Sequence, residues 1–219
     1  MDETDLRGEI VATCRRMNAL GLNQGTSGNV GVRVPEGYLL TPSGLDYDLM
    51  TPNDIVAMDF EGRYAGRRIP STEWRFHRDI LKHRPDVDVV IHTHSMFCTT
   101  LAIHGLAIPA VHYMVAVAGG TDIRCAPYVT PTTKALSDVA VAALEGRLAC
   151  LLAHHGVIVI GATLGSTLAL LVEVENLAAQ YWRALQIGKP PVLSDARMSE
   201  VLELMKSYGR QPDPELRRL

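Results

Sequence analysis

The stretch from Leu148 to Val172 contains no Asp, Glu, Lys or Arg, and this limits the possible folds more than any other feature. An uncharged segment of this length can either span a bilayer or lie buried in a protein core. However, His154 and His155 lie within it, and three glycines follow them. These residues argue against a membrane helix, whereas LACLLA and VIVIG are typical of two buried strands joined by a turn. We therefore expect a strand pair followed by the start of a helix, and no membrane span.

The rest of the chain alternates between helical and strand patterns. Apolar residues recur at helical spacing over 2–21, and helix start and stop signals bound IPSTEWRFHRDILKHRPD and TPTTKALSDVAVAALEG. Runs such as NVGVRV and GYLL are typical of strands. A hydrophobic fraction of 47% is enough for a sizeable core. We predict an α/β fold: a single three-layer domain over residues 1–219, with a largely antiparallel central β-sheet flanked by helices and a flexible C-terminal tail at 205–219.

Composition argues against several kinds of partner and location. The net charge is −3 and there is no run of Lys or Arg, which disfavours binding to nucleic acid or to an anionic membrane. The start, MDETDLRGEI, lacks the basic and apolar regions of a signal peptide. The four cysteines are not closely spaced, so we expect free thiols rather than a disulfide framework. The prediction is a cytoplasmic protein without nucleic-acid or membrane partners.

Two histidines end a strand that otherwise has the pattern of a buried one. In VVIHTH, alternate residues point to the same face, so His92 and His94 project side by side. In LLAHHGVIV, adjacent residues of a strand would face opposite ways, so only His154 or His155 can join that pair. Three imidazoles with an open fourth position are typical of a catalytic zinc site. A turn-capping role for the doubled histidine is the structural alternative.

Three short stretches of small polar residues are candidates for binding a phosphate group. They are GTSGN at 25–29, TPSG at 41–44 and PSTE at 70–73. Exposed amides at glycine turns and helix starts suit a phosphate. Each stretch alone is equally typical of an ordinary turn. Their combination with a metal site favours a phosphorylated substrate.

Two further side chains are candidates for proton transfer. Glu73 is predicted in the first turn of its helix, where the helix dipole favours a carboxylate whatever its function. Beside a metal ion it would act as a general acid/base, or fill the open metal position until substrate displaces it. Tyr113, in HYMVAVAGG, has a hydroxyl that can donate a proton to an alkoxide. The alternative for Tyr113 is a role in packing.

The combined order of these stretches resembles the class II aldolase/adducin family from Leu6 to Gly209, with most similarity to its L-fuculose-1-phosphate aldolases. The resemblance rests on GLNQGTSGNV, LLTPSG, PSTEWRFH, VVIHTHSMFCTTLA, IPAVHYMVAVAGG, CAPYVT, LLAHHGVI and PPVLSD. It implies one Zn²⁺ per subunit, held by His92, His94 and His155, with Glu73 as a further ligand in the resting enzyme. It also implies a homotetramer of fourfold cyclic symmetry with sites at subunit interfaces.

The resemblance also implies an activity. The expected reaction is the reversible, zinc-dependent cleavage of a ketose 1-phosphate to dihydroxyacetone phosphate and an aldehyde, by retro-aldol chemistry through a zinc-stabilised enediolate. Glu73 would move the proton at the carbon that becomes nucleophilic, and Tyr113 would act on the hydroxyl of the aldehyde half. The residues that would bind the substrate phosphate are Gly28, Asn29, Ser43, Gly44, Ser71 and Thr72.

The chain departs from the fuculose aldolase pattern after CAPY, where VTPTT puts Pro131 in place of an aromatic residue. In the family this position lies near the aldehyde half. L-fuculose, 5-deoxyribulose and 5-methylthioribulose 1-phosphates are therefore all candidate substrates. Alternative activities within the family are methylthioribulose-1-phosphate dehydratase and ribulose-5-phosphate 4-epimerase. A non-enzymatic adducin-like scaffold is disfavoured, because the three histidines and Glu73 are all present.

Overall fold

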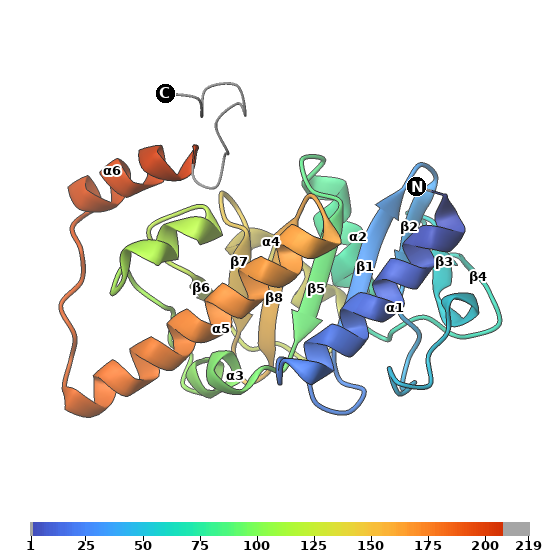
Figure 1. The fold of residues 1–219 in the computed structure, drawn as a ribbon, viewed down its shortest axis with the longest axis horizontal. Helices are drawn as coiled ribbons and strands as arrows, with labels where there is room; N and C mark the ends of the chain where they lie inside the picture. Colours follow the sequence, from blue (N-terminus) through green and yellow to red (C-terminus); the bar gives the residue numbers. More distant parts are fainter. Residues whose placement is uncertain (1, 208–219) are drawn as a thin grey trace, which may run out of the picture.

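The computed structural model describes residues 2–207, in which α-helices pack against one eight-stranded sheet (Figure 1). The strands are β1 (Asn29–Val34), β2 (Gly37–Leu40), β3 (Val56–Met58), β4 (Tyr64–Ala65), β5 (Val89–Thr93), β6 (Arg124–Ala126), β7 (Ala149–Leu152) and β8 (Gly156–Gly161). The helices are α1 (Glu3–Ala19), α2 (Trp74–His83), α3 (Met96–Ile103), α4 (Lys134–Ala143), α5 (Leu164–Ile187) and α6 (Asp195–Met205), with short 3-10 helices η1 (Pro52–Asp54) and η2 (Tyr113–Ala118). Of the tail predicted at 205–219, residues 208–219 lie outside the described part of the chain.

The uncharged stretch at 148–172 forms the strand pair β7 and β8 and then the first part of α5, as predicted. Every residue of β7 is buried, and so is β8 up to Ile160. β8 lies near the centre of the sheet, between β5 and β7, which is why its sequence is apolar on both faces. Within residues 2–207, no helix combines the length and apolar character needed to cross a bilayer.

The predicted α/β class is confirmed, but the prediction of a largely antiparallel sheet needs correction because the sheet is mixed. The strand order is β4-β3-β2-β1-β5-β8-β7-β6, and β6 runs parallel to β7 at one edge. The cause is the connection between these two strands. Helix α4 joins them as a crossover, and a strand–helix–strand unit of this kind brings its strands together in parallel.

Two apolar clusters occupy the two faces of the sheet. Helices α1, α3 and α5 pack on one face and α2 and α4 on the other, so that α1 and α5 cross in front of the sheet in Figure 1. Strand β5 contributes to both clusters: Val89 and Ile91 to the first and Val90 to the second. Because side chains alternate along a strand, His92 shares the face of Val90. That face is covered by α2, and Phe76 of this helix contacts the His92 ring edge-on with centroids 5.5 Å apart.

A buried carboxylate stabilises the loop beside β3. Asp54 is 1% exposed, and accepts hydrogen bonds from Thr51, Arg67 and Arg68. Burial by itself would raise the pKa of Asp54, but the hydrogen bonds from Thr51 and Arg68 outweigh it and hold the pKa well below its usual range. The folded state therefore gains stability from the ionised form.

Asp54→Asn is expected to lower the free energy of unfolding at neutral pH by about 2 kcal/mol, since hydrogen bonds to a charged group are lost. A lowered folded-state pKa contributes stability above the unfolded value, and this is lost as pH falls below about 4. The difference between variant and wild type should therefore shrink in acid, which urea titrations at two pH values would measure. Asp138→Asn, which breaks an exposed pair with Lys134, is the matched control and should change little. An equal effect of both substitutions would contradict this account.

Candidate active site

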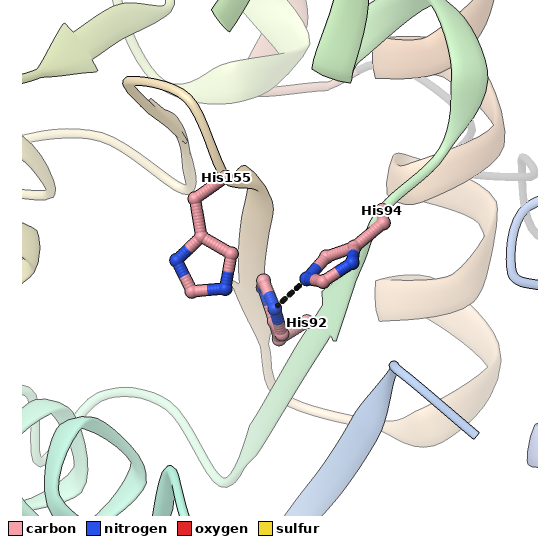
Figure 2. Close-up of side chains that lie close together, drawn as sticks. All are labelled: His92, His94 and His155. Atoms are coloured by element: carbon pink, nitrogen blue, oxygen red, sulfur yellow. Dashed lines mark hydrogen bonds between the residues drawn. The ribbon is translucent and has the colours of Figure 1, made fainter. Parts of the chain in front are cut away.

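Three histidines meet where β5 ends. His92 is in β5 and His94 follows it, while His155 lies in the turn between β7 and β8, and all three rings converge in Figure 2. The Nε2 atoms of His92 and His94 are 3.1 Å apart. One ring nitrogen from each histidine can be chosen so that all three lie within 4.8 Å of one another. This spacing allows the three nitrogens to share one metal ion.

The turn between β7 and β8 decides which member of the doubled histidine joins the cluster. His154 has a left-handed backbone, with φ 56°, and its ring meets Tyr128 edge-on instead. His155 turns toward β5. The next residue, Gly156, lies so close to β5 that a Cβ would collide with the carbonyl oxygen of Thr93 and come within 2.9 Å of the His94 ring. The close approach that brings His155 to the pair therefore depends on glycine at 156.

The environment of the cluster favours neutral imidazoles with free lone pairs. The Nδ1 of His92 donates to the carbonyl of Val157 at 2.9 Å, which leaves its Nε2 as an acceptor facing the cluster. Burial lowers the pKa of His92 to about 4, and burial also lowers the pKa of His94 below its ordinary value. Metal ions bind neutral imidazole, so these residues fit a metal ion with mainly nitrogen ligands.

Glu73 lies against this cluster. Its Oε2 is 3.3 Å from Nε2 of His92, and its Oε1 is 3.1 Å from Nε2 of His155. Burial by itself would raise the pKa of Glu73, but the proximity of His92 and the hydrogen bond from His155 outweigh it, so the pKa lies well below its usual range. Glu73 stands just before α2 rather than inside its first turn, as the N-cap residue, without a capping hydrogen bond from its side chain. The carboxylate is therefore free to face the histidines.

A cleft of about 570 Å³ opens beside the cluster, and Glu73, His94 and His155 are on its wall. Its lining also contains every residue predicted to bind phosphate: Gly28, Asn29, Ser43, Gly44, Ser71 and Thr72. Two contacts explain why segments far apart in sequence meet here. Asn29 pairs with His92 in the β1–β5 ladder, and an isolated bridge joins Pro42 to Pro70. The three small-residue turns thus surround one cleft, as a common ligand would require.

Tyr113 is not among the residues that line this cleft. It begins η2, its side chain is 48% exposed, and its ring lies against His112. A single chain therefore does not bring Tyr113 to the histidines, and its predicted role stays a prediction.

Two polar residues that support the site were missed in the sequence. His77 and Glu175 both contact residues beside the cluster, but they do so through tertiary hydrogen bonds. Each had a weak signal. His77 lies four residues after Glu73 and so on the same side of a helix, and Glu175 is an acidic residue in the apolar run LALLVEVENLAA.

Glu175 fixes the start of α3, directly after His94. Its carboxylate accepts hydrogen bonds from the Ser95 hydroxyl and from the backbone N–H groups of Phe97 and Cys98, at 2.7, 2.7 and 2.9 Å. A negative charge at a helix N-terminus is favourable. These hydrogen bonds link α5 to the segment that follows His94.

Glu175→Gln is expected to lower the free energy of unfolding by about 1.5–3 kcal/mol, because charge-assisted hydrogen bonds are lost. Thermal and urea denaturation would measure the change. Glu173→Gln, two residues earlier on the same helix, is the matched control and should cost less than half as much. Equal losses for the two variants would show that the contacts of Glu175 with α3 are not significant.

Comparison with known proteins identifies the group to which this fold and site belong. The chain belongs to the class II aldolase and adducin family, since residues 8–182 match the family described as the Class II Aldolase and Adducin N-terminal domain. A solved structure described as L-fuculose 1-phosphate aldolase superimposes with a TM-score of 0.90 at 38% identity, covering 94% of this chain and 98% of the other.

Curated relatives are similar over nearly their full lengths. A 5-methylthioribulose-1-phosphate/5-deoxyribulose-1-phosphate aldolase of Rhodospirillum rubrum is 55% identical over 204 residues, which is 93% of this chain and 92% of the relative. An L-fuculose phosphate aldolase of Escherichia coli strain K12 is 46% identical over 210 residues, which is 95% of this chain and 98% of the relative. A 5-deoxy-D-ribulose 1-phosphate aldolase of Bacillus thuringiensis is 36% identical over 208 residues, which is 94% of this chain and 97% of the relative.

Proposed function

We propose that this chain is a zinc-dependent class II aldolase that reversibly cleaves a ketose 1-phosphate to dihydroxyacetone phosphate and an aldehyde. One observation carries the proposal: Glu73 and two of the three clustered histidines line the same cleft as three turns of small polar residues. The cleft thus combines donors for a metal ion, a buried carboxylate and a pocket for an anion. The relatives at 55% and 46% identity carry aldolase names, which supports the same reaction class.

The metal site of the proposed enzyme consists of His92, His94 and His155, with Glu73 as a further ligand before substrate binds. Three neutral imidazoles and an open position are the ligand set of a catalytic zinc, at one Zn²⁺ per subunit. When bound, zinc supplies Lewis-acid polarisation of the substrate's carbonyl oxygen. No lysine lies among the residues that line the cleft, so a Schiff base has no candidate there.

The phosphate would bind against the turns of small polar residues in the cleft wall. Ser43 and Ser71 offer hydroxyls, and Gly44 has a positive φ of 63° that only glycine adopts easily. The remaining residues of the proposed phosphate pocket are Gly28, Asn29 and Thr72. Anchoring the phosphate holds the neighbouring carbons in a fixed orientation toward Glu73.

Proton transfer at the carbon beside the carbonyl is assigned to Glu73. In the cleavage direction the hydroxyl of the aldehyde half loses its proton to solvent as the carbon–carbon bond breaks, and the electron pair of that bond stays on the phosphate-bearing half as an enediolate. Glu73 then takes up a proton from solvent and delivers it to the carbon, which forms dihydroxyacetone phosphate. Tyr113 would act on the hydroxyl of the aldehyde half. Because Tyr113 lies outside the cleft of its own chain, this role requires a second copy, in keeping with a homotetramer whose sites lie at subunit interfaces.

The substrate is proposed to be L-fuculose, 5-deoxyribulose or 5-methylthioribulose 1-phosphate. Relatives named for each of these sugars are similar to this chain. Pro131 and Thr132 line the cleft, and Thr132 has a left-handed backbone with φ 68°. This wall is where an aldehyde half with fewer hydroxyls would be accommodated.

We further propose that residues 1–219 form a single domain and that the protein is cytoplasmic. Residues of every strand from β1 to β8 join one sheet, which supports a single folding unit. All four cysteines are free, as expected in a reducing compartment.

Product analysis of the zinc-loaded protein tests the proposal. Each of the three ketose 1-phosphates is incubated with enzyme, and products are identified by mass spectrometry and by reduction of any triose phosphate. Release of dihydroxyacetone phosphate with an equimolar aldehyde supports an aldolase, and the ranking of kcat/KM identifies the aldehyde half. Loss of water without carbon–carbon cleavage would instead indicate a dehydratase, and an isomeric pentose phosphate an epimerase.

A further inference from the structure

His77 lies behind the site without lining the cleft. It stands in α2 four residues after Glu73, on the side that faces the sheet, and its side chain is 0% exposed. A fully buried histidine needs a structural or functional reason, since burying its polar nitrogens is costly. Its hydrogen bonds supply one.

A chain of two hydrogen bonds joins His77 to Glu73. The Nε2 of His77 is 2.6 Å from Oδ1 of Asn29, and Nδ2 of Asn29 donates to Oε2 of Glu73 at 2.9 Å. The acceptor is the carboxylate oxygen that faces His92. Asn29 also pairs with His92 across the β1–β5 ladder, so its backbone is fixed by the sheet. The backbone therefore leaves only the orientation of the Asn29 side-chain amide free to vary.

The direction of these hydrogen bonds is set by the chemistry of the groups. An ionised carboxylate can only accept, so Asn29 must present its NH₂ to Glu73 and its oxygen to His77. His77 must then donate from Nε2. Its Nδ1 has no hydrogen-bond partner among the described residues, which also favours the proton on Nε2. Burial, with the nearby His92, lowers the pKa of His77 to about 3, so the ring is neutral.

The His77 ring is held in place by close packing. It stacks on Phe76 with ring centroids 4.7 Å apart. Gly31 of β1 also lies close to the ring, since a Cβ at this position would come within 2.5 Å of Nδ1 and 3.1 Å of Cγ. Because residue 31 of β1 is a glycine, the sheet leaves the space that the His77 imidazole fills. A ring confined in this way can hold the Asn29 amide in one orientation.

We propose that His77 is a positioning residue, which fixes the orientation of the Asn29 amide and through it the carboxylate of Glu73. This inference rests on the proposed function, in which Glu73 transfers the proton. Without the Nε2–H donor the Asn29 amide can rotate, and its oxygen would then repel the carboxylate. The consequence is a slower chemical step, with a much smaller effect on binding of the substrate phosphate, because the backbone of Asn29 stays fixed by the β1–β5 ladder.

His77→Leu removes the donor and is expected to lower kcat about 10- to 100-fold, the usual cost of losing a supporting hydrogen bond behind a reactive group. KM and metal content should stay near the wild-type values. His77→Gln keeps an amide N–H near the position of Nε2 and should restore most of kcat. Rescue by the glutamine variant would not occur if His77 served only to fill space.

Two further variants separate positioning from stability. Gly31→Ala pushes the His77 ring away without changing any polar group. It should therefore lower kcat when made in the wild-type protein. When it is made in the His77→Leu variant, it should change kcat little further. Ile80→Val removes one buried methyl from the same helix and should lower the melting temperature while kcat stays unchanged. If His77→Leu has a reduced melting temperature but keeps the wild-type kcat, the proposal is overturned.

The ¹⁵N resonances of metal-loaded protein labelled in histidine and asparagine give a readout that does not depend on turnover. We expect His77 to be neutral and protonated at Nε2, and the Asn29 side-chain NH₂ signals to shift in His77→Leu. Protonation at Nδ1 would overturn the inference. If the wild type cleaves none of the three substrates, the proposed function fails and these spectra alone decide the role of His77. If the wild type cleaves one of them and His77→Leu cleaves it equally fast, only the inference fails.

Discussion

Replacing Glu73 with glutamine is expected to lower kcat about 10²- to 10⁴-fold, the range that a positioned general acid/base contributes. The amide has the size of the carboxylate but cannot accept and return a proton. The three histidines remain, so the variant should still bind one Zn²⁺ per subunit. Steady-state kinetics of triose phosphate release, with metal content measured on the same samples, would test this.

The control for this substitution is Glu61→Gln. Glu61 lies in the turn before β4, paired with Arg63, and both side chains are largely exposed. The same chemical change there should leave kcat and metal content unchanged. A Glu73→Gln enzyme with native turnover would show that another group transfers the proton.

Loss of the metal is expected to have the second large effect. Removing zinc with a chelator should lower kcat at least ~100-fold, since Lewis-acid stabilisation contributes several kcal/mol. Adding Zn²⁺ back should restore the rate. Activity that survives complete removal of metal would exclude the proposed role of the histidine cluster.

The doubled histidine provides a matched pair of variants for the same claim. His155→Ala should lose bound metal, because its Nε2 faces Glu73 and the other two rings. His154→Ala should keep its metal, because the His154 ring faces Tyr128 instead. Metal content by mass spectrometry of the two purified proteins measures the difference. The reverse result, with metal lost only from His154→Ala, would mean that the turn is arranged differently in the loaded protein.

Local patterns predicted much of the fold, because the relevant information lies within each segment. The strand period places His92 and His94 together, and the apolar runs of β7 and β8 indicate buried strands. The choice between His154 and His155 could not be made from the sequence, since it depends on a left-handed residue and on the close approach of Gly156 to β5. These are properties of tertiary packing rather than of periodicity.

The parallel edge of the sheet and the supporting residues were harder to predict. The crossover through α4 decides the direction of β6, and nothing in the three residues of β6 encodes it. His77 and Glu175 act through contacts with residues 48 and 78 positions away, at Asn29 and Phe97. Tyr113 lies outside the cleft of its own chain, so neither periodicity nor a single subunit tests its proposed role.

Hydrogen exchange into dihydroxyacetone phosphate tests the central claim most directly, because it needs no knowledge of the aldehyde. The zinc-loaded protein is incubated with this compound in deuterated water, and incorporation is followed by NMR. We predict that one hydrogen at the hydroxymethyl carbon exchanges, and that Glu73→Gln prepared in parallel exchanges it at least ~100-fold more slowly. The absence of exchange in zinc-loaded wild-type protein, or equal exchange in both proteins, would contradict the assignment of this site as an aldolase centre with Glu73 as its base.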